Sequence, residues 1–382
     1  MQKNFLHGVQ VIDINDGART ISVASSSVIG IVGTAPNADP AAFPLNTPVL
    51  IAGSPAMAAK LITGVGADNG TLPDAVDSIF DQSLAVLVVV RVDVGTGANA
   101  DAATMANVVG GVNAITGNYE GVHAFLSAES IAGVKPRILI APGFTHQAGG
   151  TVQAPTTNPA VAEMQAIANS LRAVIIQDGP NTTDSAAMAA ATTGGSKRTY
   201  LVDPVALKLD ATGATVQTYG SSCAAGVIAA TDNTLGWWAS PSNQPVNGII
   251  GTARPIPFSM GDNSCAASLL NAANVATIIR QNGFRLWGNR TLSADPKWAF
   301  LCVVRTADII ADSLQAAHLW AVDKGITKNY VSDVQEGVNA FLRDLKTQGA
   351  ILGGHCWVDR DLNSDSSIAQ GKVLWDFDFT PV

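Results

Sequence analysis

Two glycine-rich segments are the first places where this sequence could carry out chemistry. Residues 64–70 read GVGADNG and residues 193–198 read TGGSKR, which supply the glycines and, in the second segment, the lysine of a phosphate-binding loop. Such a loop must follow a strand and open a helix, because the N-terminus of the helix binds the phosphate. The first segment follows a predicted helix and the second precedes a predicted strand. We therefore expect neither segment to bind a nucleotide.

A third segment, residues 251–255, reads GTARP and resembles the serine segment of subtilases. Ala253 stands where that chemistry needs a nucleophile, so hydrolysis is not expected here. The five histidines are scattered, and no pair of His, Asp or Glu has the spacing of metal ligands. The four cysteines are also widely spaced, which indicates reduced thiols. These residues favour a protein that is not an enzyme and that holds no metal or cofactor.

The composition is that of a folded protein with a weakly charged surface. The chain has 382 residues, of which 47% are hydrophobic and only 14% are charged, so we expect two or more domains. Surfaces of this kind are often covered by other subunits. The net charge of −8 argues against nucleic acid as the main partner. We find no signal-peptide pattern and no run of about 18 apolar residues, so a membrane partner is not expected either.

Apolar runs alternate with helical patterns from residue 27 to residue 254. The runs lie at residues 28–32, 49–52, 84–92, 138–141, 173–176 and 200–202. The helical patterns lie at residues 55–61, 72–82, 159–172, 184–193 and 222–231. Continuous apolar runs are typical of strands covered on both faces, and strand–helix alternation predicts an open, mostly parallel sheet of the α/β class. The segments 93–131 and 143–157 are expected to be surface loops.

The remainder of the chain predicts an α+β arrangement beyond a turn-rich boundary at residues 236–257. Helices are predicted at residues 265–282 and 307–324. A last helix should begin at a capping box of Ser332 and Gln335. Its buried face is predicted to contain Val334, Val338, Phe341, Leu342 and Leu345. Two strands, at residues 354–359 and 371–380, are expected to finish the chain.

Strands are predicted at both ends of the chain. Near the N-terminus the apolar residues are Val9, Val11, Ile12 and Ile14. Near the C-terminus Val373, Trp375 and Phe377 alternate along one face. A terminal strand either pairs within its own domain or adds to the sheet of a neighbouring molecule. Both alternatives are open from these residues alone.

Several longer segments carry a resemblance to a known family. Residues 271–280 read NAANVATIIR, residues 283–300 read GFRLWGNRTLSADPKWAF, and residues 321–331 read AVDKGITKNYV. Residues 362–375 read LNSDSSIAQGKVLW, and residues 7–21 read HGVQVIDINDGARTI. Together these segments resemble the contractile tail sheath proteins of bacteriophages and R-type pyocins. Family members usually continue into a further C-terminal strand. Two explanations are open for this chain: a genuinely shortened C-terminal arm, which would weaken self-assembly, or a truncated product.

The resemblance implies a structural role. Sheath proteins of this kind stack as hexameric discs around an inner tail tube and contract to drive the tube through a bacterial cell envelope. The implied partners are further copies of the chain, the inner tail tube protein, and the baseplate and tail terminator proteins, with no nucleic acid, membrane or cofactor. The implied location is the tail of a virion or of a pyocin-like particle, assembled in the host cytoplasm. The alternatives are a sheath of another contractile injection system and, less favoured, an α/β hydrolase or nucleotide-binding enzyme.

The resemblance also implies a domain plan. Residues 25–254 would form an outer, subtilisin-like, non-catalytic α/β domain, and residues 255–369 would form an inner α+β domain that faces the tube. Residues 1–24 would be an N-terminal arm that joins the inner domain, and residues 370–382 a C-terminal arm.

Within this plan three sets of residues receive roles. Strand pairing between subunits is assigned to Val9, Val11, Ile12, Ile14, Val373, Trp375 and Phe377. Contact with the tube is assigned to Lys324, Lys328, Arg343 and Lys346, with solvated helix ends as the alternative. Support of the inner domain is assigned to Arg285, Trp287, Asn289 and Arg290.

Overall fold

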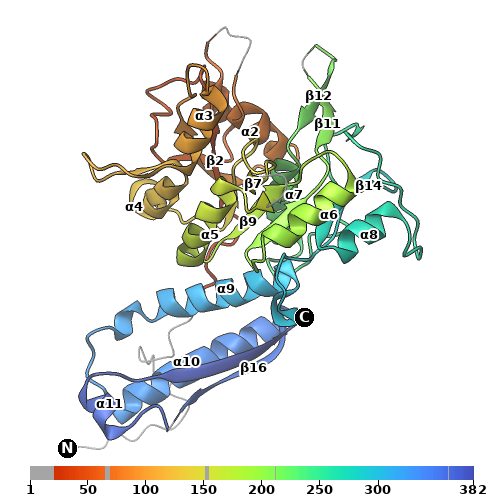
Figure 1. Cartoon of the computed structure of the whole chain (residues 1–382). Coiled ribbons are helices and arrows are strands. Elements are labelled where there is room, and N and C mark those ends of the chain that lie inside the picture. The colour runs from red at the N-terminus through yellow and green to blue at the C-terminus, as the bar shows by residue number, and fades with distance from the viewer. Residues whose placement is uncertain (1–20, 65–68, 151–154, 211, 360) are drawn as a thin grey trace, which may run out of the picture. The chain divides into compact units, whose positions relative to one another are not determined.

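The computed structural model describes residues 21–64, 69–150, 155–210, 212–359 and 361–382 (Figure 1). The described residues form two compact units. The larger unit comprises residues 25–310, and the smaller one, here called the C-terminal unit, comprises residues 311–382 with residues 21–24.

The larger unit is built on an eight-stranded sheet in the order β15-β14-β10-β9-β6-β1-β3-β2. Its strands are β1 (Ile29–Thr34), β2 (Val49–Ala52), β3 (Val86–Val92), β6 (Ile138–Ile140), β9 (Val174–Asp178), β10 (Thr199–Val202), β14 (Val275–Arg280) and β15 (Phe284–Trp287). The six strands from β14 to β3 run parallel, and an antiparallel strand lies at each edge. The predicted α/β class and mostly parallel sheet are confirmed.

Helices cover both faces of this sheet. They are α2 (Leu72–Phe80), α3 (Ala100–Val109), α5 (Pro159–Leu171), α6 (Asp184–Thr193), α7 (Gly220–Thr234) and α8 (Ala266–Ala272), with the 3-10 segment η2 (Gly121–Ser127). Ile138 and Ile140 of β6 pack in one core layer with α2 and α7. Leu139, between them, packs in the other layer with α3, α5 and η2. The strands are continuously apolar because side chains on both faces are buried.

Local signals set the start of two of these helices. Asn158 caps α5, since its side chain accepts hydrogen bonds from the backbone N–H groups of Ala160 (2.9 Å) and Val161 (3.2 Å). Pro159 occupies the first turn, where its missing N–H costs nothing. Thr183 caps α6 through the N–H of Ala186 at 3.1 Å.

The predicted helix at residues 265–282 is wrong in its second half. α8 ends at Ala272, and β14 and β15 follow as an antiparallel hairpin. Asn282 and Gly283 have φ values of 51° and 94°, which suit a tight hairpin turn. Because β14 pairs with β10, this segment adds two strands to the large sheet. The domain boundary predicted after residue 254 is therefore also wrong: residues 255–310 belong to the larger unit.

The segment 93–131 is also more ordered than the predicted surface loop. It contains α3, η2, β4 (Gly111–Val112), β5 (Tyr119–Glu120) and α4 (Ala128–Ala132). Val108, Val122 and Phe125 from this segment are fully buried against the sheet, which explains the difference. The other small elements of the larger unit are α1 (Pro55–Ala58), η1 (Ala59–Leu61), β7 (Gly149–Gly150), β8 (Pro155–Thr156), β11 (Ala206–Leu209), β12 (Thr215–Thr218), β13 (Gly251–Thr252) and η3 (Pro296–Trp298).

The C-terminal unit contains helices and a two-stranded antiparallel sheet. Its elements are the end of α9 (Leu301–Ala317), η4 (Leu319–Ala321), α10 (Lys328–Thr347), β16 (Ile351–Val358), α11 (Asp365–Ala369) and β17 (Trp375–Pro381). β16 pairs with β17, and α10 packs against β16. In the described part of the chain no helix is both long and apolar enough to cross a membrane.

The long helix of this unit confirms its predicted buried face but not its predicted start. Val334, Val338, Phe341, Leu342 and Leu345 are all buried, as expected from their spacing. α10 begins at Lys328, however, and Thr327 caps it by accepting a hydrogen bond from the N–H of Tyr330 (3.2 Å). The proposed capping box of Ser332 and Gln335 therefore lies inside the helix. α9 likewise begins at Leu301 rather than at residue 307.

Two buried ion pairs attach the start of α9 to the rest of the larger unit. Arg305 binds both carboxylate oxygens of Asp232 on α7 and also donates to the carbonyl of Ser26 (3.1 Å). Arg198 binds Asp308 in the same bidentate way. Both pairs are almost fully buried. Removing one partner of such a pair leaves a charge without compensation in a low-dielectric interior.

We predict that Asp232→Ala will lower the free energy of unfolding of the chain by about 3–5 kcal/mol, because Arg305 would remain buried and unpaired. Urea unfolding followed by circular dichroism measures the change. Asp333→Ala on the exposed side of α10 is the control and should change stability by no more than about 0.5 kcal/mol. Equal, small losses of unfolding free energy in the two variants would show that the buried pair contributes little to stability.

Candidate functional site

The carboxyl end of the parallel sheet holds a buried carboxylate. Asp178, the last residue of β9, accepts hydrogen bonds from the backbone N–H (2.7 Å) and the hydroxyl (2.6 Å) of Ser221, and from the hydroxyl of Thr145 (3.3 Å). Ser221 lies in the first turn of α7, so the carboxylate also faces the positive end of that helix. Burial nevertheless raises the pKa of Asp178 to about 6. This carboxylate attaches α7 to the sheet.

This cluster was missed by the sequence analysis, although an aspartate at the end of a buried strand was an available signal. It places a serine beside a carboxylate, which are two of the groups used in hydrolysis. Ser221 has no exposed surface, and its hydroxyl is already donated to Asp178. No hydrogen bond within the described ranges links a histidine to Ser221. The arrangement therefore supports packing of α7 rather than attack on a substrate.

Ala253, compared above with a hydrolase nucleophile, lies directly after the short strand β13. Its backbone N–H donates to the carbonyl of Val205 (3.0 Å), beside strand β11. It does not open a helix, so it differs from a nucleophile position in its local structure. The neighbouring Arg254 binds Asp203 (2.7 Å) and Asp184 (2.8 Å). Burial raises the pKa of Asp203, and the hydrogen bond from Arg254 opposes that rise.

The structure describes one of the two glycine-rich segments in full and the other only in part. In the segment 193–198, α6 ends at Thr193 and β10 begins at Thr199, so the segment joins a helix to a strand as predicted. The segment 64–70 lies mostly outside the described residues. Within the described ranges no group of three or more His, Cys, Asp or Glu side chains could hold a metal ion.

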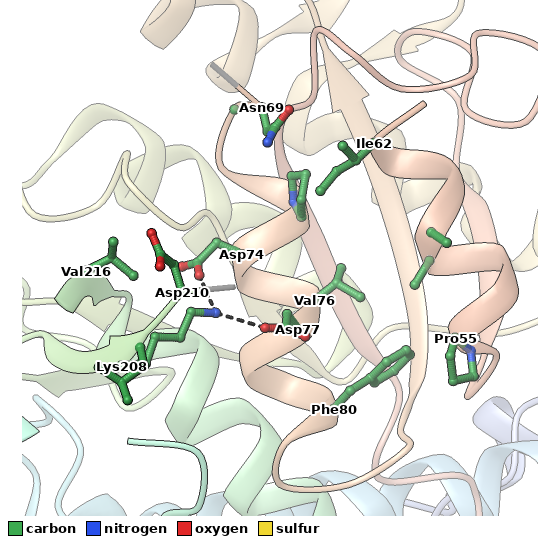
Figure 2. Close-up of a pocket in the computed structure, with 15 residues that line it drawn as sticks. Pro55, Ile62, Asn69, Asp74, Val76, Asp77, Phe80, Lys208, Asp210 and Val216 are labelled. Atoms are coloured by element: carbon green, nitrogen blue, oxygen red, sulfur yellow. Dashed lines mark hydrogen bonds and ion pairs between the residues drawn. The ribbon is translucent and has the colours of Figure 1, made fainter. Parts of the chain in front are cut away.

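A groove of about 580 Å³ lies between α2, the segment around α1, and the β11–β12 hairpin (Figure 2). Lys208 of β11 reaches into it and binds Asp74 and Asp77 of α2. Figure 2 shows the ammonium group pointing at the two carboxylates rather than into the open groove. Because both carboxylates neutralise it, Lys208 serves to hold the hairpin on α2. The groove has no other cation among its described lining residues.

The sheet of the C-terminal unit has one covered face. Cys356 of β16 lies opposite Phe377 of β17, and Val358 lies opposite Trp375, so these four side chains share a face. Cys356 is buried, and the indole Nε1 of Trp375 donates to the carbonyl of Val331 on α10 (3.3 Å). This face therefore packs toward α10. Phe377 is still 38% exposed, since α10 packs mainly against β16.

One outer edge of this sheet is capped by a side chain. The amide of Asn339 on α10 accepts a hydrogen bond from the N–H of Cys356 (2.8 Å) and donates to its carbonyl (3.0 Å). Asn339 thus takes the place of a neighbouring strand beside β16. The geometry also shows that the backbone groups of Cys356 point away from β17. In an antiparallel pair the opposite residue, Phe377, must then point its own N–H and C=O away from β16.

The predicted strand-pairing residues fall into two groups. Val9, Val11, Ile12 and Ile14 lie outside the described residues. Val373 precedes β17, whereas Trp375 and Phe377 lie within it. The ring of Trp375 makes an edge contact with Tyr330 (5.9 Å between centroids), so it belongs to the core of its own unit. Pairing with a second molecule would use the backbone of β17, not this side chain.

The predicted tube-facing cations do not form one cluster. Lys324 and Lys328 lie before and at the start of α10, whereas Arg343 and Lys346 lie in its last turns. Lys346 lies 18 positions after Lys328, which corresponds to about 27 Å of helix. All four side chains are exposed, and no ion pair to them occurs within the described ranges.

The cluster around Trp287 lies in the larger unit, not in the predicted inner domain, because β15 belongs to the large sheet. Arg285 donates to the carbonyl of Asn243 (2.7 Å), and Trp287 makes an edge contact with Phe258 (4.9 Å). Asn289 donates to the sulfur of Cys302 (3.2 Å). Arg290 differs from the other three, since it is exposed and its guanidinium lies over the ring of Phe300.

We predict that Asp178 makes the chain less stable as the pH rises from about 4 to about 6. Its folded-state pKa of about 6 exceeds the ordinary value of 3.8, so the folded state binds more protons in this window. The loss corresponds to at most about 3 kcal/mol. Urea unfolding at several pH values should show a decline in the unmodified chain that is smaller in Asp178→Asn. An identical pH dependence in the two chains would contradict the assignment.

Two family descriptions match adjacent parts of the chain. Residues 117–292 match the phage tail sheath protein central domain, and residues 293–382 match the phage tail sheath C-terminal domain. A putative prophage major tail sheath protein of Pseudomonas aeruginosa (strain UCBPP-PA14) is 46% identical over 99% of this chain and 94% of its own length. The tail sheath protein of Escherichia phage P2 is 38% identical over 99% of this chain and 93% of its own length.

Solved structures show the same fold at lower identity. The helical sheath of the anti-feeding prophage in its contracted state has a TM-score of 0.68 and 18% identity, with 99% of this chain and 96% of that chain covered. The contracted sheath complex of PVC, an extracellular contractile injection system, has a TM-score of 0.68 and 16% identity, with coverage of 100% and 95%. With relatives this similar over nearly the whole sequence, the chain belongs to the phage tail sheath protein family.

Proposed function

We propose that this chain polymerises as stacked hexameric discs around an inner tail tube and that the polymer contracts to drive the tube through a bacterial cell envelope. Membership of the tail sheath family supports the sheath role, and the contracted sheaths among the structural relatives support contraction. The tail of a virion or pyocin-like particle, assembled in the host cytoplasm, is the corresponding location. Baseplate and terminator proteins would bind the two ends of the polymer.

The observation that carries this proposal is the outer edge of β17. Asn339 caps the outer edge of β16, whereas no strand pairs with the outer edge of β17 among the described residues. Phe377 lies opposite Cys356 and therefore points its N–H and C=O toward that edge. An uncapped edge of this kind accepts a strand from another chain. The edge therefore supports strand exchange between copies.

The N-terminal segment of a neighbouring copy is the proposed added strand, with Val9, Val11, Ile12 and Ile14 along it. Each backbone hydrogen bond formed would contribute about 0.5–1.5 kcal/mol. Such an interface is heterologous, because the donating and accepting surfaces differ, and heterologous contacts that do not close produce a helical polymer. Linked strands would keep copies together while their rigid parts change packing during contraction.

The inner tube is proposed to contact the exposed cations of α10 and of the segment before it. Because about 27 Å separates Lys328 from Lys346, these cations would make two contacts rather than one. Each exposed pair contributes less than about 1 kcal/mol, but many identical subunits repeat it along the tube. Weak repeated contacts of this kind can break when the sheath contracts.

A mechanical rather than enzymatic role is part of the proposal. The serine beside Asp178 is buried, and Ala253 does not open a helix. The segment 193–198 joins a helix to a strand, which is unlike a phosphate-binding loop. The energy for contraction would then be stored at assembly in a metastable lattice. Assays for hydrolase and nucleotide-binding activity should be negative.

We predict that Phe377→Pro will prevent tube formation. Proline removes the N–H that points to the open edge and leaves the bonds between β16 and β17 in place. Negative-stain electron microscopy of the purified chain should show hollow striated tubes, and the variant should remain as small particles.

Phe377→Leu is the matched control, because it changes the same side chain and keeps the N–H group. Tubes from the control together with none from the proline variant would support strand addition at this edge. Circular dichroism should confirm that the proline variant is folded. Normal tubes from Phe377→Pro would show that the edge of β17 is not used, and no tubes from the unmodified chain would contradict self-assembly of the sheath.

A further inference from the structure

A cluster of cations and aromatic rings on the larger unit takes no part in the proposed strand addition. This cation–aromatic patch consists of Lys197, Arg290, Lys297, Trp298 and Phe300. The Nζ atoms of Lys197 and Lys297 lie 4.0 Å and 5.2 Å from the ring centroid of Trp298. The guanidinium carbon of Arg290 lies 5.5 Å from the ring centroid of Phe300, which is 44% exposed. The patch thus presents cations held by aromatic rings.

Backbone hydrogen bonds hold the patch in place. Thr291 donates its N–H to the carbonyl of Ala299 (2.9 Å) and its hydroxyl to the carbonyl of Trp298 (2.7 Å). Leu292 donates its N–H to the carbonyl of Thr199 (3.0 Å), which brings the segment after Lys197 to the same place. Asp295 caps η3, accepting the N–H of Lys297 at 2.9 Å. The backbone that carries these rings and cations is therefore fixed before any partner binds.

The charge of the patch is not balanced within the described residues. None of its three cations forms an ion pair there, whereas the nearby Arg198 and Arg305 each bind a carboxylate bidentately. Two ammonium groups approach one ring, so they repel each other unless an anion lies between them. A rigid, positively charged surface of this kind fits an acidic partner that also carries aromatic groups.

We propose that the cation–aromatic patch binds the acidic sheet face of a second copy of this chain. The inference rests on the proposed polymerisation. The acidic sheet face consists of Asp376 and Asp378 of β17 with His355 and Trp357 of β16. Asp376 lies opposite Trp357 and Asp378 lies opposite His355, so all four side chains project from the face turned away from α10.

The chemistry of the two surfaces is complementary. His355 and Trp357 stack with their rings 5.8 Å apart, and Trp357 is 37% exposed, so aromatic surface lies beside the two carboxylates. Residues 311–382 contain ten acidic and six basic side chains, which gives this part of the chain a net negative charge. The cation–aromatic patch lies on the larger unit, and the acidic sheet face lies on the C-terminal unit of the same chain. Each copy in a helical polymer could therefore bind one neighbour through its patch and another through its acidic face.

Single-stranded nucleic acid is the other class of partner that such a patch could bind, through stacking and phosphate contacts. The net charge of −8 opposes it, because the rest of the protein would repel a polyanion. The acidic face of a second copy is therefore the better match, and nucleic acid becomes an outcome of the test.

The test uses charge reversal in the full chain. One variant carries Arg290→Glu and Lys297→Glu, a second carries Asp376→Lys and Asp378→Lys, and a third carries all four changes. The control carries Lys60→Glu and Arg280→Glu, which changes the net charge equally at exposed positions of the larger unit. Arg280 lies over Phe284 at 5.7 Å, so the control also removes one cation–aromatic contact. Circular dichroism checks that every variant is folded.

Sedimentation velocity at low and high salt measures association, and electron microscopy measures tubes. We expect the first two variants to raise the concentration needed for association about tenfold or more. The third variant should recover association, and the control should match the unmodified chain. High salt should weaken association in the unmodified chain and in the third variant alike.

Several outcomes would overturn the proposal. One is a chain that stays monomeric in sedimentation at every salt concentration. Another is unchanged association in the first two variants. A third is a folded four-change variant that does not recover association. If the unmodified chain bound labelled single-stranded DNA and the Arg290→Glu, Lys297→Glu variant did not, the patch would be assigned to nucleic acid binding. Normal tubes from both reversed variants would reject this docking while leaving the sheath function intact.

Discussion

A strand at the edge of a sheet presents backbone N–H and C=O groups that need partners, and this constraint shapes the C-terminal unit. Its sheet has only two strands, which are too few to enclose a core without another element. α10 covers one face, and the side chain of Asn339 caps the outer edge of β16. Asn363 binds the backbone of Leu374, just before β17, but no side chain in the described residues binds the outward N–H and C=O of Phe377. The unit therefore has one edge whose hydrogen bonds a second molecule can complete.

The larger unit meets the same constraint internally at one edge of its sheet, where residues 243–246 form hydrogen bonds with the outer side of β15. Its parallel strands are buried on both faces by helices. Its buried charges are matched as well, since Asp178 accepts hydrogen bonds at the start of α7 and Arg305 binds Asp232. A unit with its core charges compensated in this way can move as a rigid body. That property suits a lattice in which folded parts change their packing without unfolding.

Charge on the surface follows a different pattern from charge in the core. Buried arginines are bound bidentately, whereas Lys197, Arg290 and Lys297 lie over aromatic rings and have no carboxylate partner within the described ranges. Leaving a cation unpaired costs little at the surface, where water solvates it, and a great deal in the interior. Unpaired surface cations on a rigid frame are thus available to a partner at small cost to the fold.

Much of the fold could be predicted from short-range patterns. The buried strands up to residue 202 and the helices α2, α5, α6 and α7 all lie where apolar runs and helical spacing placed them. The buried face of α10 was also correct, residue by residue. These features depend on periodicity and capping, which are properties of neighbouring residues. The resemblance to tail sheath proteins was carried by long segments of sequence and needed no structure.

Other features depended on contacts between distant residues. Residues 275–280 have apolar positions that suit a helix as well as a strand, and only pairing with β10 decides for the strand. Asn282 and Gly283 are typical of a hairpin turn, but the helical spacing of the apolar residues before them led to the prediction of a helix. The pairing of β14 with β10 also places residues 255–310 in the larger unit, so the two units divide later in the chain than the sequence predicted. The capping of Cys356 by Asn339 joins residues from two elements, and no spacing in the sequence could reveal it.

The sequence by itself determined the family, the α/β class and the buried faces of the helices, because these follow from residue order over short distances. Tertiary structure decided which edge is capped, where the units divide and which cations have partners. Those properties depend on atoms brought together from distant parts of the chain. They are also the properties that govern how one copy meets another.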